Sequence, residues 1–535
     1  MRRVSFFCPI VSTFLALWLL PAVGWAQGTI EGTVTFWGDP GGGTQIEIAA
    51  MPDNWSGPAA TVLVGLNDSF SLPVPDGSYY VWAYMDRDGG FGDADDEDVI
   101  VYYDADGDGA WDMVPVTGGA TTGIDIDLGF VYVDIDATGA NDGTTWSNAF
   151  TDLQDGIDLA VSGIEVWVAE GTYVPGTSRS DSFLPKAGVR VCGGFTGSET
   201  MRIQRDWNAH PTILSCEIGA AAATDNCYHV IRAETANPYA VFDGVTITRG
   251  YANGGTIEDY GGGVRARGGG VTLANVTVID NYAQAAGGGA MANLGGTIKA
   301  YNTSFVNNRA PYFEGGAYYG SVASAQPQTL VNCVFANNSA WRGGGIALTS
   351  SGLQPELVNL TLSGNTASGE GGGIYVNAPT IQFVIHNSIL WGNTGPNAQI
   401  SAYAGVNWPE VNHSIVQGGW THGGTHILDV DPSFADAELR LNLDSPAIDA
   451  GDNTAVAIDL HDADGNHWTD EPIHADRDFN QRFRNLPYIP NTGVAAPGEW
   501  PVDMGAYEAW DPTVIFEHDF EGGGLDPWSN VVGAI

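Results

Sequence analysis

The chain has 535 residues and a net charge of −44, with 63 Asp and Glu against 19 Lys and Arg. Such a surface repels nucleic acid and anionic membranes, so partners bound through their phosphates are excluded, and it attracts divalent cations. The 73 glycines favour tight turns, and the length exceeds what one hydrophobic core usually serves, so we expect several domains or an elongated repeat fold.

Residues 1–26 are predicted to be an export signal. Arg2 and Arg3 form its positive start, an apolar run follows over Val4–Leu20, and Gly24-Trp25-Ala26 ends in small residues suited to cleavage. No later stretch is apolar and long enough to span a membrane. We therefore expect a secreted protein, extracellular or on the outer cell surface, monomeric and without a transmembrane segment once the signal is removed.

Residues 27–128 are predicted to form an antiparallel β-sandwich. Short runs such as Thr29–Phe36 and Tyr79–Tyr84 alternate apolar and polar residues, and turn residues separate them. The stretch Phe70–Asp88 resembles the prealbumin-like and carboxypeptidase regulatory-like modules, which share an immunoglobulin-like sandwich architecture. The module is therefore expected to be an accessory domain of a secreted protein.

Acidic loops in this module are predicted to bind calcium. Carboxylates on alternate residues, bent by glycine, can converge on a cation that prefers about six to eight oxygen ligands. A helix-loop-helix site is excluded because Pro115 stands where its last Glu ligand is needed. The alternative is a solvated acidic surface. The predicted ligands are Asp86, Asp88, Asp104, Asp106, Asp108 and Asp112.

A right-handed parallel β-helix is predicted over residues 130–418, and a short helix is expected at its start. Leu153, Ile157 and Ala160 follow helical spacing within Thr151–Val161, with Thr151 as the N-cap. Such a helix would cover the strand edges that the first coil exposes.

An internal repeat is the basis of the β-helix prediction. Asparagines recur at intervals of 25 to 30 residues, a second set follows six residues later, and glycine runs follow the second set. A period of this length cannot bury its apolar face alone and must stack on its neighbours, each coil adding about 4.8 Å. The first set is Asn275, Asn302, Asn332, Asn359, Asn387 and Asn412, and the second is Asn281, Asn308, Asn338, Asn365 and Asn393.

Like residues are then expected to stack in columns along the axis. Asparagines fit ladders in sharp turns, and glycines fit turns that need positive φ. A helical solenoid is disfavoured because each period carries glycines and β-branched residues. One apolar column is Val278, Phe305, Phe335, Leu362 and Leu390, and a second is Val264, Ala290, Ala317, Ile346 and Ile374.

Alternation from the second column predicts an outward column that includes Arg265, Tyr318 and Tyr375, with Arg267 beside it. The two arginines could meet an anionic sugar, with the tyrosines as stacking platforms. The alternative is an ordinary solvated sheet face.

Two features complete the chain. Residues 419–511 lose the repeat but keep apolar runs, so they are predicted to cover the other end of the solenoid; residues 512–535 form a tail of no derivable role.

Cys216 and Cys227 flank a loop of small residues, and export to an oxidising compartment makes them the expected disulfide. The alternative for this pair is two buried thiols.

Short phrases spread from Tyr132 to Glu508 resemble those of bacterial secreted right-handed β-helix proteins, related to polymorphic outer membrane proteins and to the "choice-of-anchor" Q group. The resemblance implies a secreted or surface protein and no particular activity. Cys216 and Cys227 depart from it, since Gly or Ser is usual there, which supports the disulfide. The phrases are Thr144–Phe150, Val166–Tyr173, Gly193–Thr200, Arg205–Trp207, Thr212–Ser215, Asp444–Gly451 and Asp503–Glu508.

The expected function is adhesion or glycan binding without turnover. β-Helix folds host polysaccharide lyases and glycoside hydrolases, but a fold assigns no activity. A hydrolase needs paired carboxylates, whereas Asp243, Asp259 and Asp280 stand singly in the repeat. The alternatives are a polysaccharide lyase that uses Arg265 or Arg267 with calcium on acidic glycans, and a structural cell-envelope protein.

Overall fold

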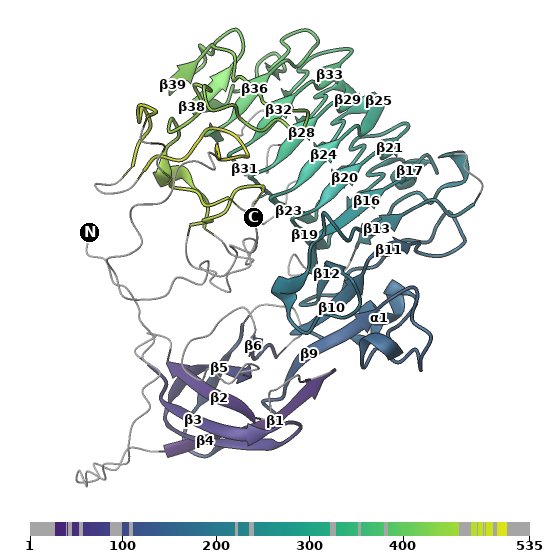
Figure 1. The fold of residues 1–535 in the computed structure, drawn as a ribbon, viewed down its shortest axis with the longest axis vertical. Coiled ribbons are helices and arrows are strands. Elements are labelled where there is room, and N and C mark those ends of the chain that lie inside the picture. Colours follow the sequence, from purple (N-terminus) through teal and green to yellow (C-terminus); the bar gives the residue numbers. More distant parts are fainter. Residues whose placement is uncertain are drawn as a thin grey trace. The chain divides into compact units, whose positions relative to one another are not determined.

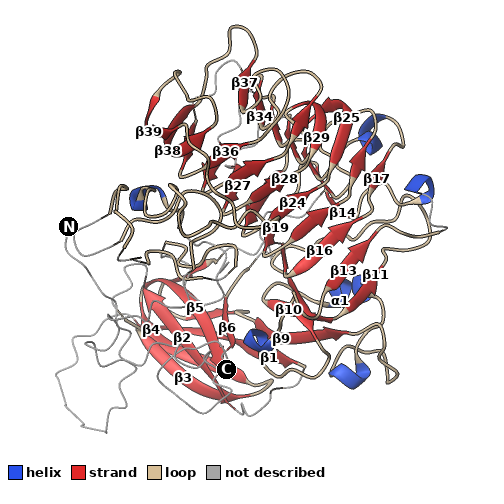
Figure 2. Cartoon of the chain, turned by 45° about the horizontal axis from the view of Figure 1, so that its top comes forward, coloured by secondary structure: helices blue, strands red, loops and turns tan. Residues whose placement is uncertain are grey.

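The computed structural model describes residues 27–38, 40, 45–52, 57–85, 99–105, 111–219, 223–234, 240–321, 328–350, 355–378, 383–458, 472–478, 480–484, 486, 488–495 and 500–510. The chain divides into two compact units, Met1–Lys299 with Tyr318–Ser324, and Ala300–Ala317 with Ala325–Ile535. Strands dominate both units, and the few helices are short (Figures 1 and 2). The all-β prediction is confirmed.

The first unit begins with a β-sandwich. In one sheet β5 pairs antiparallel with β2, β6 and β7, and β2 pairs with β3. In the other, β1 pairs antiparallel with β4 and parallel with β8. The strands are β1 (Gln27–Trp37), β2 (Gln45–Pro52), β3 (Ala60–Gly65), β4 (Ser69–Pro75), β5 (Gly77–Met85), β6 (Val99–Tyr102), β7 (Met113–Val116) and β8 (Ala120–Thr122).

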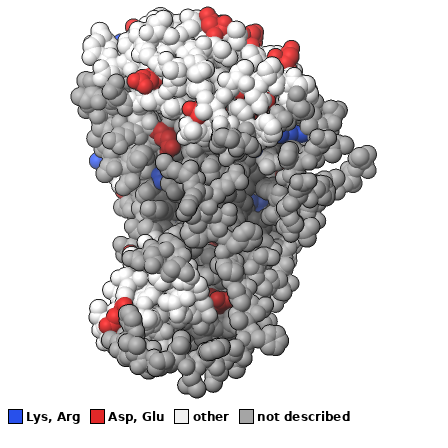
Figure 3. Space-filling model, turned by 90° about the vertical axis from the view of Figure 1, so that its left-hand side faces the viewer, with Lys and Arg blue, Asp and Glu red and all other residues white. Residues whose placement is uncertain are grey.

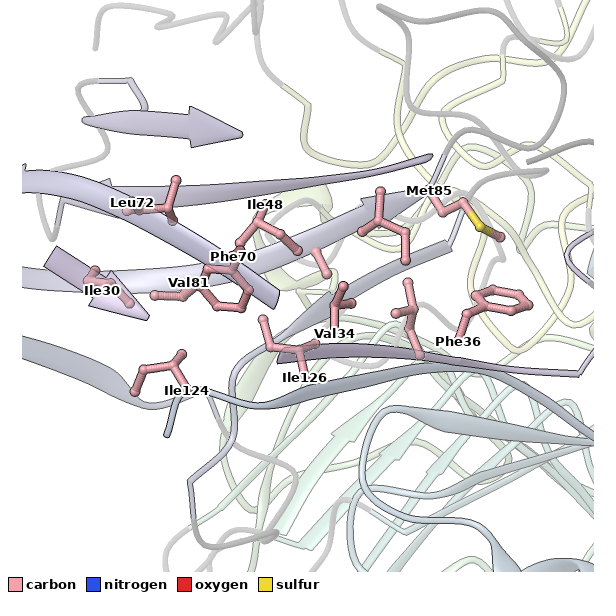
Figure 4. Packing of buried hydrophobic residues seen from close by; sticks show 14 of the residues in the cluster. Ile30, Val34, Phe36, Ile48, Phe70, Leu72, Val81, Met85, Ile124 and Ile126 are labelled. Carbon is pink, nitrogen blue, oxygen red and sulfur yellow. The ribbon is translucent and has the colours of Figure 1, made fainter. Parts of the chain in front are cut away.

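The sandwich core follows the alternation seen in the sequence. On β4, Phe70, Leu72 and Val74 are buried while the residues between them are exposed. Figure 4 shows Phe70 packed among Ile48 and Val81 of the opposite sheet. Burying one such side chain stabilises the fold by about 1.5–3 kcal/mol, so the period-two pattern is enough to hold the two sheets together.

Strand β9 (Ile126–Val133) belongs to both the sandwich and the coils that follow. Its first half pairs in parallel with β1, ending at Trp37↔Gly129, and its second half pairs in parallel with β10 (Ile164–Ala169). Gly129 has a φ of 121°, and a Cβ there would lie 2.1 Å from the carbonyl oxygen of Trp37. The boundary expected between residues 128 and 130 therefore falls inside a strand.

The coils of the first unit form stacks of parallel strands. The stacks run β10-β12-β15-β19, β11-β13-β16-β20, β14-β18-β22-β26 and β17-β21. Their strands are β11 (Gly171–Tyr173), β12 (Arg190–Phe195), β13 (Thr212–Ser215), β14 (Ile231–Ala233), β15 (Val241–Asp243), β16 (Val245–Thr248), β17 (Tyr251–Ala252), β18 (Val264–Ala266), β19 (Gly270–Ala274), β20 (Thr277–Ile279), β21 (Tyr282–Ala283), β22 (Met291–Asn293) and β26 (Tyr318–Gly320); β23 (Thr297–Tyr301) follows β22 in the chain.

The second unit repeats this architecture. Its parallel stacks run β24-β28-β32-β36-β38-β39, β27-β31-β35-β38, β30-β34-β37 and β25-β29-β33. The strands are β24 (Ser304–Val306), β25 (Arg309–Glu314), β27 (Gln328–Val331), β28 (Val334–Ala336), β29 (Ser339–Arg342), β30 (Ile346–Leu348), β31 (Pro355–Val358), β32 (Thr361–Ser363), β33 (Thr366–Ala367), β34 (Ile374–Val376), β35 (Val384–His386), β36 (Ile389–Trp391), β37 (Ile400–Ala402), β38 (Glu410–Val416) and β39 (Gly424–Leu428).

The first predicted apolar column is buried throughout. In the second unit its members share one register across successive strands, and the rings of Phe305 and Phe335 stack with centroids 4.8 Å apart. Each of the following is 0% exposed: Val278, Phe305, Phe335, Leu362 and Leu390.

The second asparagine set forms the expected ladder. Asn308 donates a side-chain hydrogen bond to Asn338 at 3.0 Å, Asn338 donates to Asn365 at 2.9 Å, and Asn365 donates to Asn393 at 2.8 Å. All four are buried. The amides of Asn308, Asn338 and Asn365 thus find a partner in the next coil, and that of Asn393 donates to Leu362 and Gln399, which satisfies groups that would otherwise be costly to bury.

The first asparagine set occupies left-handed turns. Asn275, Asn302, Asn332, Asn359 and Asn387 have φ between 47° and 57°, a conformation that asparagine tolerates better than most residues. Asn412 is not the next member: Asn412 pairs with His386, so His413, with φ of 46°, occupies the equivalent turn. The prediction was wrong by one residue because the type of residue changes in that coil.

The second apolar column was also misaligned in two coils. Val264 pairs with Met291, which pairs with Tyr318, so Ala290 and Ala317 are not its members. In each of the five coils, one glycine occupies the equivalent turn, with φ between 61° and 78°, and lies three residues before the column residue of that coil. A run of glycines does not reveal which one adopts the left-handed conformation. These glycines are Gly261, Gly288, Gly315, Gly343 and Gly371.

Helix α1 (Leu153–Leu159) lies where a cap helix was predicted, but its N-cap is Asp152, whose carboxylate accepts from the Gln154 amide. Leu153, Ile157 and Ala160 are buried as expected. Among the described residues, no helix is long and apolar enough to cross a membrane. The short 3-10 helices are η1 (Trp146–Asn148), η2 (Arg202–Gln204), η3 (Ala223–Asp225), η4 (Thr256–Asp259) and η5 (Asn453–Ala455).

The C-terminal segment lies along the outside of the second unit's coils. Ala457 and Ile473 pack against Val331 and Val358, and Tyr507 packs in a cluster with residues of β28. Other residues of the segment bury Ile389 and Ile415. The segment therefore covers the side of several coils, a wider contact than the end cap expected from the sequence.

Candidate functional site

The predicted calcium loop is described in part. Asp86, Asp88, Asp106 and Asp108 lie outside the described residues. Asp104 accepts a hydrogen bond from the Ser162 hydroxyl at 2.6 Å, and Asp112 accepts one from the Ala105 amide at 2.8 Å. These contacts fix both ends of the loop 104–112.

A cavity of about 290 Å³ opens beside Asp104, and Asp125 and Asp127 also line it. Thr33 donates to Oδ1 of Asp125 through its amide and its hydroxyl, and the Trp37 indole donates to Oδ1 of Asp127. Oxygen donors of this kind suit calcium. The described residues alone contain no group of three side chains that could hold a metal ion.

The predicted outward column is not solvated. Arg265, Tyr318 and Tyr375 are each 0% exposed, so the expectation of an open face at these residues was wrong; Arg267 is exposed. Tyr318 belongs to the inward column with Met291, because it lies three residues after Gly315, the left-handed glycine of a run that is one residue shorter than in the preceding coil. Arg265 and Tyr375 alternate with inward residues, but neighbouring chain covers both.

Arg265 is covered by a charged cluster that includes η4. Its guanidinium pairs with Glu234 and, at 2.8 Å, with Glu258, and it also contacts His229 Nε2 at 2.9 Å. The hydrogen bond with His229 and the charge of Arg265 lower the pKa of Glu258 to about 2, against its partial burial. Burial lowers the pKa of His229. This arrangement neutralises Arg265 and leaves it no face for a sugar.

An exposed aromatic and charged surface lies in the second unit, and it was not predicted from the sequence. Trp341 is 40% exposed, although the Arg342 guanidinium covers one ring face at 3.9 Å. Arg342 also lies 5.1 Å from the Tyr375 ring and 3.6 Å from Glu314. We call this surface the Trp341 patch; it consists of Tyr312, Glu314, Trp341, Arg342, Glu370, Tyr375 and Tyr403.

Local backbone geometry exposes the two foremost rings of the patch. Between β25 and β29 the register shifts: Ala310 pairs with Ala340 and Glu314 pairs with Arg342, so three residues of β25 face Trp341 alone. Such a bulge re-aims side chains, and Tyr312 within it is 71% exposed. A Cβ at Gly369 in the next coil would lie 3.1 Å from the Trp341 indole nitrogen, so glycine provides room for that ring.

Tyr375 forms the buried floor of the patch. The pKa of Tyr375 is raised to about 12, chiefly by burial. The charges of Glu314, Glu370 and Tyr403 also raise it, and Arg342 opposes the shift. Its hydroxyl and the Nε of Arg342 are buried with no hydrogen-bond partner among the described residues. Buried polar atoms in this state need a partner such as water or a ligand.

The sequence does carry a signal for this patch. Aromatic and charged residues stand directly before the glycine turns of two successive coils, as Tyr312-Phe313-Glu314 and Trp341-Arg342. The predicted binding column contains only residues that follow the glycines, so it does not include the aromatic and charged residues that precede them. The room that Gly369 leaves depends on the alignment of the coils and is visible only in the structure.

Residues 208–390 match the family described as the right handed beta helix region. No curated protein and no solved structure matches the chain. Together with the parallel stacks, the family match establishes a right-handed parallel β-helix, as the repeat predicted.

Proposed function

We propose that this protein is exported and binds a glycan at the Trp341 patch without turning it over. The observation that carries the proposal is an indole 40% exposed, held by Arg342 on one side and supported by the room at Gly369. Aromatic ring faces carry negative charge that attracts polarised C–H groups, and sugars present such groups. The Arg342 guanidinium, with its side chain 23% exposed, supplies hydrogen-bond donors beside the rings.

Binding without turnover agrees with the charges in the patch. A glycoside hydrolase needs one carboxyl group as acid and a second as base or nucleophile. Burial raises the pKa of Glu314, but Arg342 at 3.6 Å opposes that shift and keeps the carboxylate paired. The lyase alternative loses one of its two proposed arginines, since Arg265 is buried between two glutamates, whereas Arg267 is exposed.

Three features support an extracellular location. The chain begins with the predicted export signal, and the Cys216–Cys227 disulfide, with Cα atoms 5.0 Å apart, suits an oxidising compartment. The phrases shared with polymorphic outer membrane and "choice-of-anchor" Q proteins fit the same location. Calcium at the loop 104–112 belongs to this proposal as a structural ion.

Retention on insoluble polysaccharides tests the proposal. We expect the chain from Gln27 onward to be retained, and Trp341→Ala to abolish retention. Trp510→Ala is a matched control, because Trp510 is 50% exposed and also lies against an arginine, Arg484, at 4.1 Å. Release of reducing ends, or new ultraviolet absorbance from unsaturated sugars, would instead show turnover.

A further inference from the structure

The charge of the Trp341 patch restricts the class of glycan that it can bind. Its cation, Arg342, is flanked by Glu314 at 3.6 Å and by the Trp341 and Tyr375 rings. Glu370 adds a second carboxylate that acts on Tyr375. Two carboxylates against one guanidinium leave the patch negative.

The wider surface has the same sign. The chain carries a net charge of −44, and on the side opposite β25 and β29, which Figure 3 draws, red acidic side chains are more widespread than blue basic ones over the described surface. An approaching polyanion is repelled by such a field. Arg342 cannot offset this repulsion because it is already paired and stacked.

The polar groups at the surface of the patch suit sugar hydroxyls. The guanidinium of Arg342, whose side chain is 23% exposed, can only donate. The Glu314 carboxylate, whose side chain is 10% exposed, can only accept when ionised. A hydroxyl both donates and accepts, so one class of group can satisfy both, whereas a sugar carboxylate or sulfate would face Glu314 and Glu370.

We infer that the ligand of the Trp341 patch is a neutral polysaccharide, whose sugar rings stack on Trp341 and Tyr312 while hydroxyls bond to Arg342 and Glu314. This inference rests on the proposed function and specifies its ligand class. This class differs from the anionic sugar that the sequence predicts as the ligand of Arg265 and Arg267.

Affinity electrophoresis of the chain from Gln27 onward would test the inference. The neutral probes are mixed-linkage β-glucan, xylan and galactomannan, and the anionic probes are polygalacturonate, alginate and dextran sulfate. We expect at least one neutral polymer to slow the protein at both about 50 mM and about 500 mM salt, since no net charge is screened. We expect no anionic polymer to bind.

Three variants locate the binding. Trp341→Ala should weaken it about tenfold or more, as expected for truncating an aromatic anchor, and Trp341→Phe should restore part of it. Tyr312→Ala, at a residue 71% exposed, should weaken binding with an unchanged melting temperature. Trp510→Ala should leave binding unchanged.

The outcomes separate the two claims. Binding to anionic polymers, alone or with neutral ones, overturns the inference and leaves glycan binding in place. Neutral binding that survives both Trp341→Ala and Tyr312→Ala overturns the assignment to this patch. Binding to none of the six polymers overturns the proposed function itself.

Discussion

The two units bury their carboxylates in different ways. In the first, arginines outnumber the acid they surround: Asp243, 1% exposed, pairs with Arg190 at 2.9 Å and with Arg205 at 2.8 Å. Burial alone would raise the pKa of Asp243, but these arginines hold it below its usual value. The carboxylate therefore stays charged.

The second unit gathers three buried carboxylates around Arg482, which pairs with Glu508 at 2.6 Å, and a fourth, Asp449, lies beside Asp503. Burial raises the pKa of Asp449 to about 7, with the charge of Asp503 adding to the effect, and it raises the pKa of Asp476 and Asp503 to about 6 and that of Glu508 well above its usual value. Two arginines thus keep the single acid of the first cluster charged, whereas burial favours the protonated forms of the four acids in the second.

The largest effect that we expect does not depend on how either unit accommodates its buried carboxylates. Phe335→Ala should destabilise the protein by about 3–5 kcal/mol, because the stacked coils cannot close around the space left beside Phe305. Denaturant unfolding at pH 5 and pH 8 should give the same loss, since no charge is involved. A loss below about 1 kcal/mol would contradict the stacked column.

Arg205→Met tests the first unit. Removing one partner of a buried ion pair is expected to cost about 3 kcal/mol, reduced here to the extent that Arg190 compensates. Arg205 is the first of the two arginines that lower the pKa of Asp243, so its removal raises that pKa, and the loss should be smaller at pH 5 than at pH 8. An equal loss at both pH values would mean that Arg190 alone keeps Asp243 ionised.

Calcium is the third expected effect, and it concerns Asp104, Asp106 and Asp108 of the first unit. Bringing Asp104, Asp106 and Asp108 together costs repulsion that a cation would reverse. At a calcium concentration of about a hundred times the dissociation constant, binding adds about 2.7 kcal/mol to the free energy of unfolding. Chelator should lower the melting temperature, and Asp106→Ala with Asp108→Ala should abolish the shift. If titration calorimetry detects no binding at millimolar calcium, the loop is a solvated surface.

Asp449→Asn tests the second unit, with a smaller expected effect of about 2 kcal/mol. The folded pKa of Asp449 is raised to about 7 from 3.8, so folding favours the protonated form and the wild type loses stability as pH rises from about 4 to 7. The variant should melt above the wild type at pH 8, and the difference should vanish by about pH 4. An equal difference at both pH values would indicate changed packing.

The sequence predicts what repeats and misses what depends on a single coil. The column through Phe335 and the ladder through Asn338 recur in every period, so their burial follows from counting. Arg265 appears outward by the same counting, yet η4 in its own coil covers it. Trp341 stays exposed because of two features in the neighbouring coils, the bulge in β25 and the glycine at position 369. Exposure is set by insertions between strands, and periodicity carries no information about them.

The shared strand β9 has a mechanical consequence. Because β9 pairs with β1 along one half and with β10 along the other, tension applied to the sandwich passes into the first coils through interstrand hydrogen bonds as well as through the covalent chain. A flexible linker would let the module swing and would store no load. Here the strands must shear past one another before the sandwich and the first coils separate.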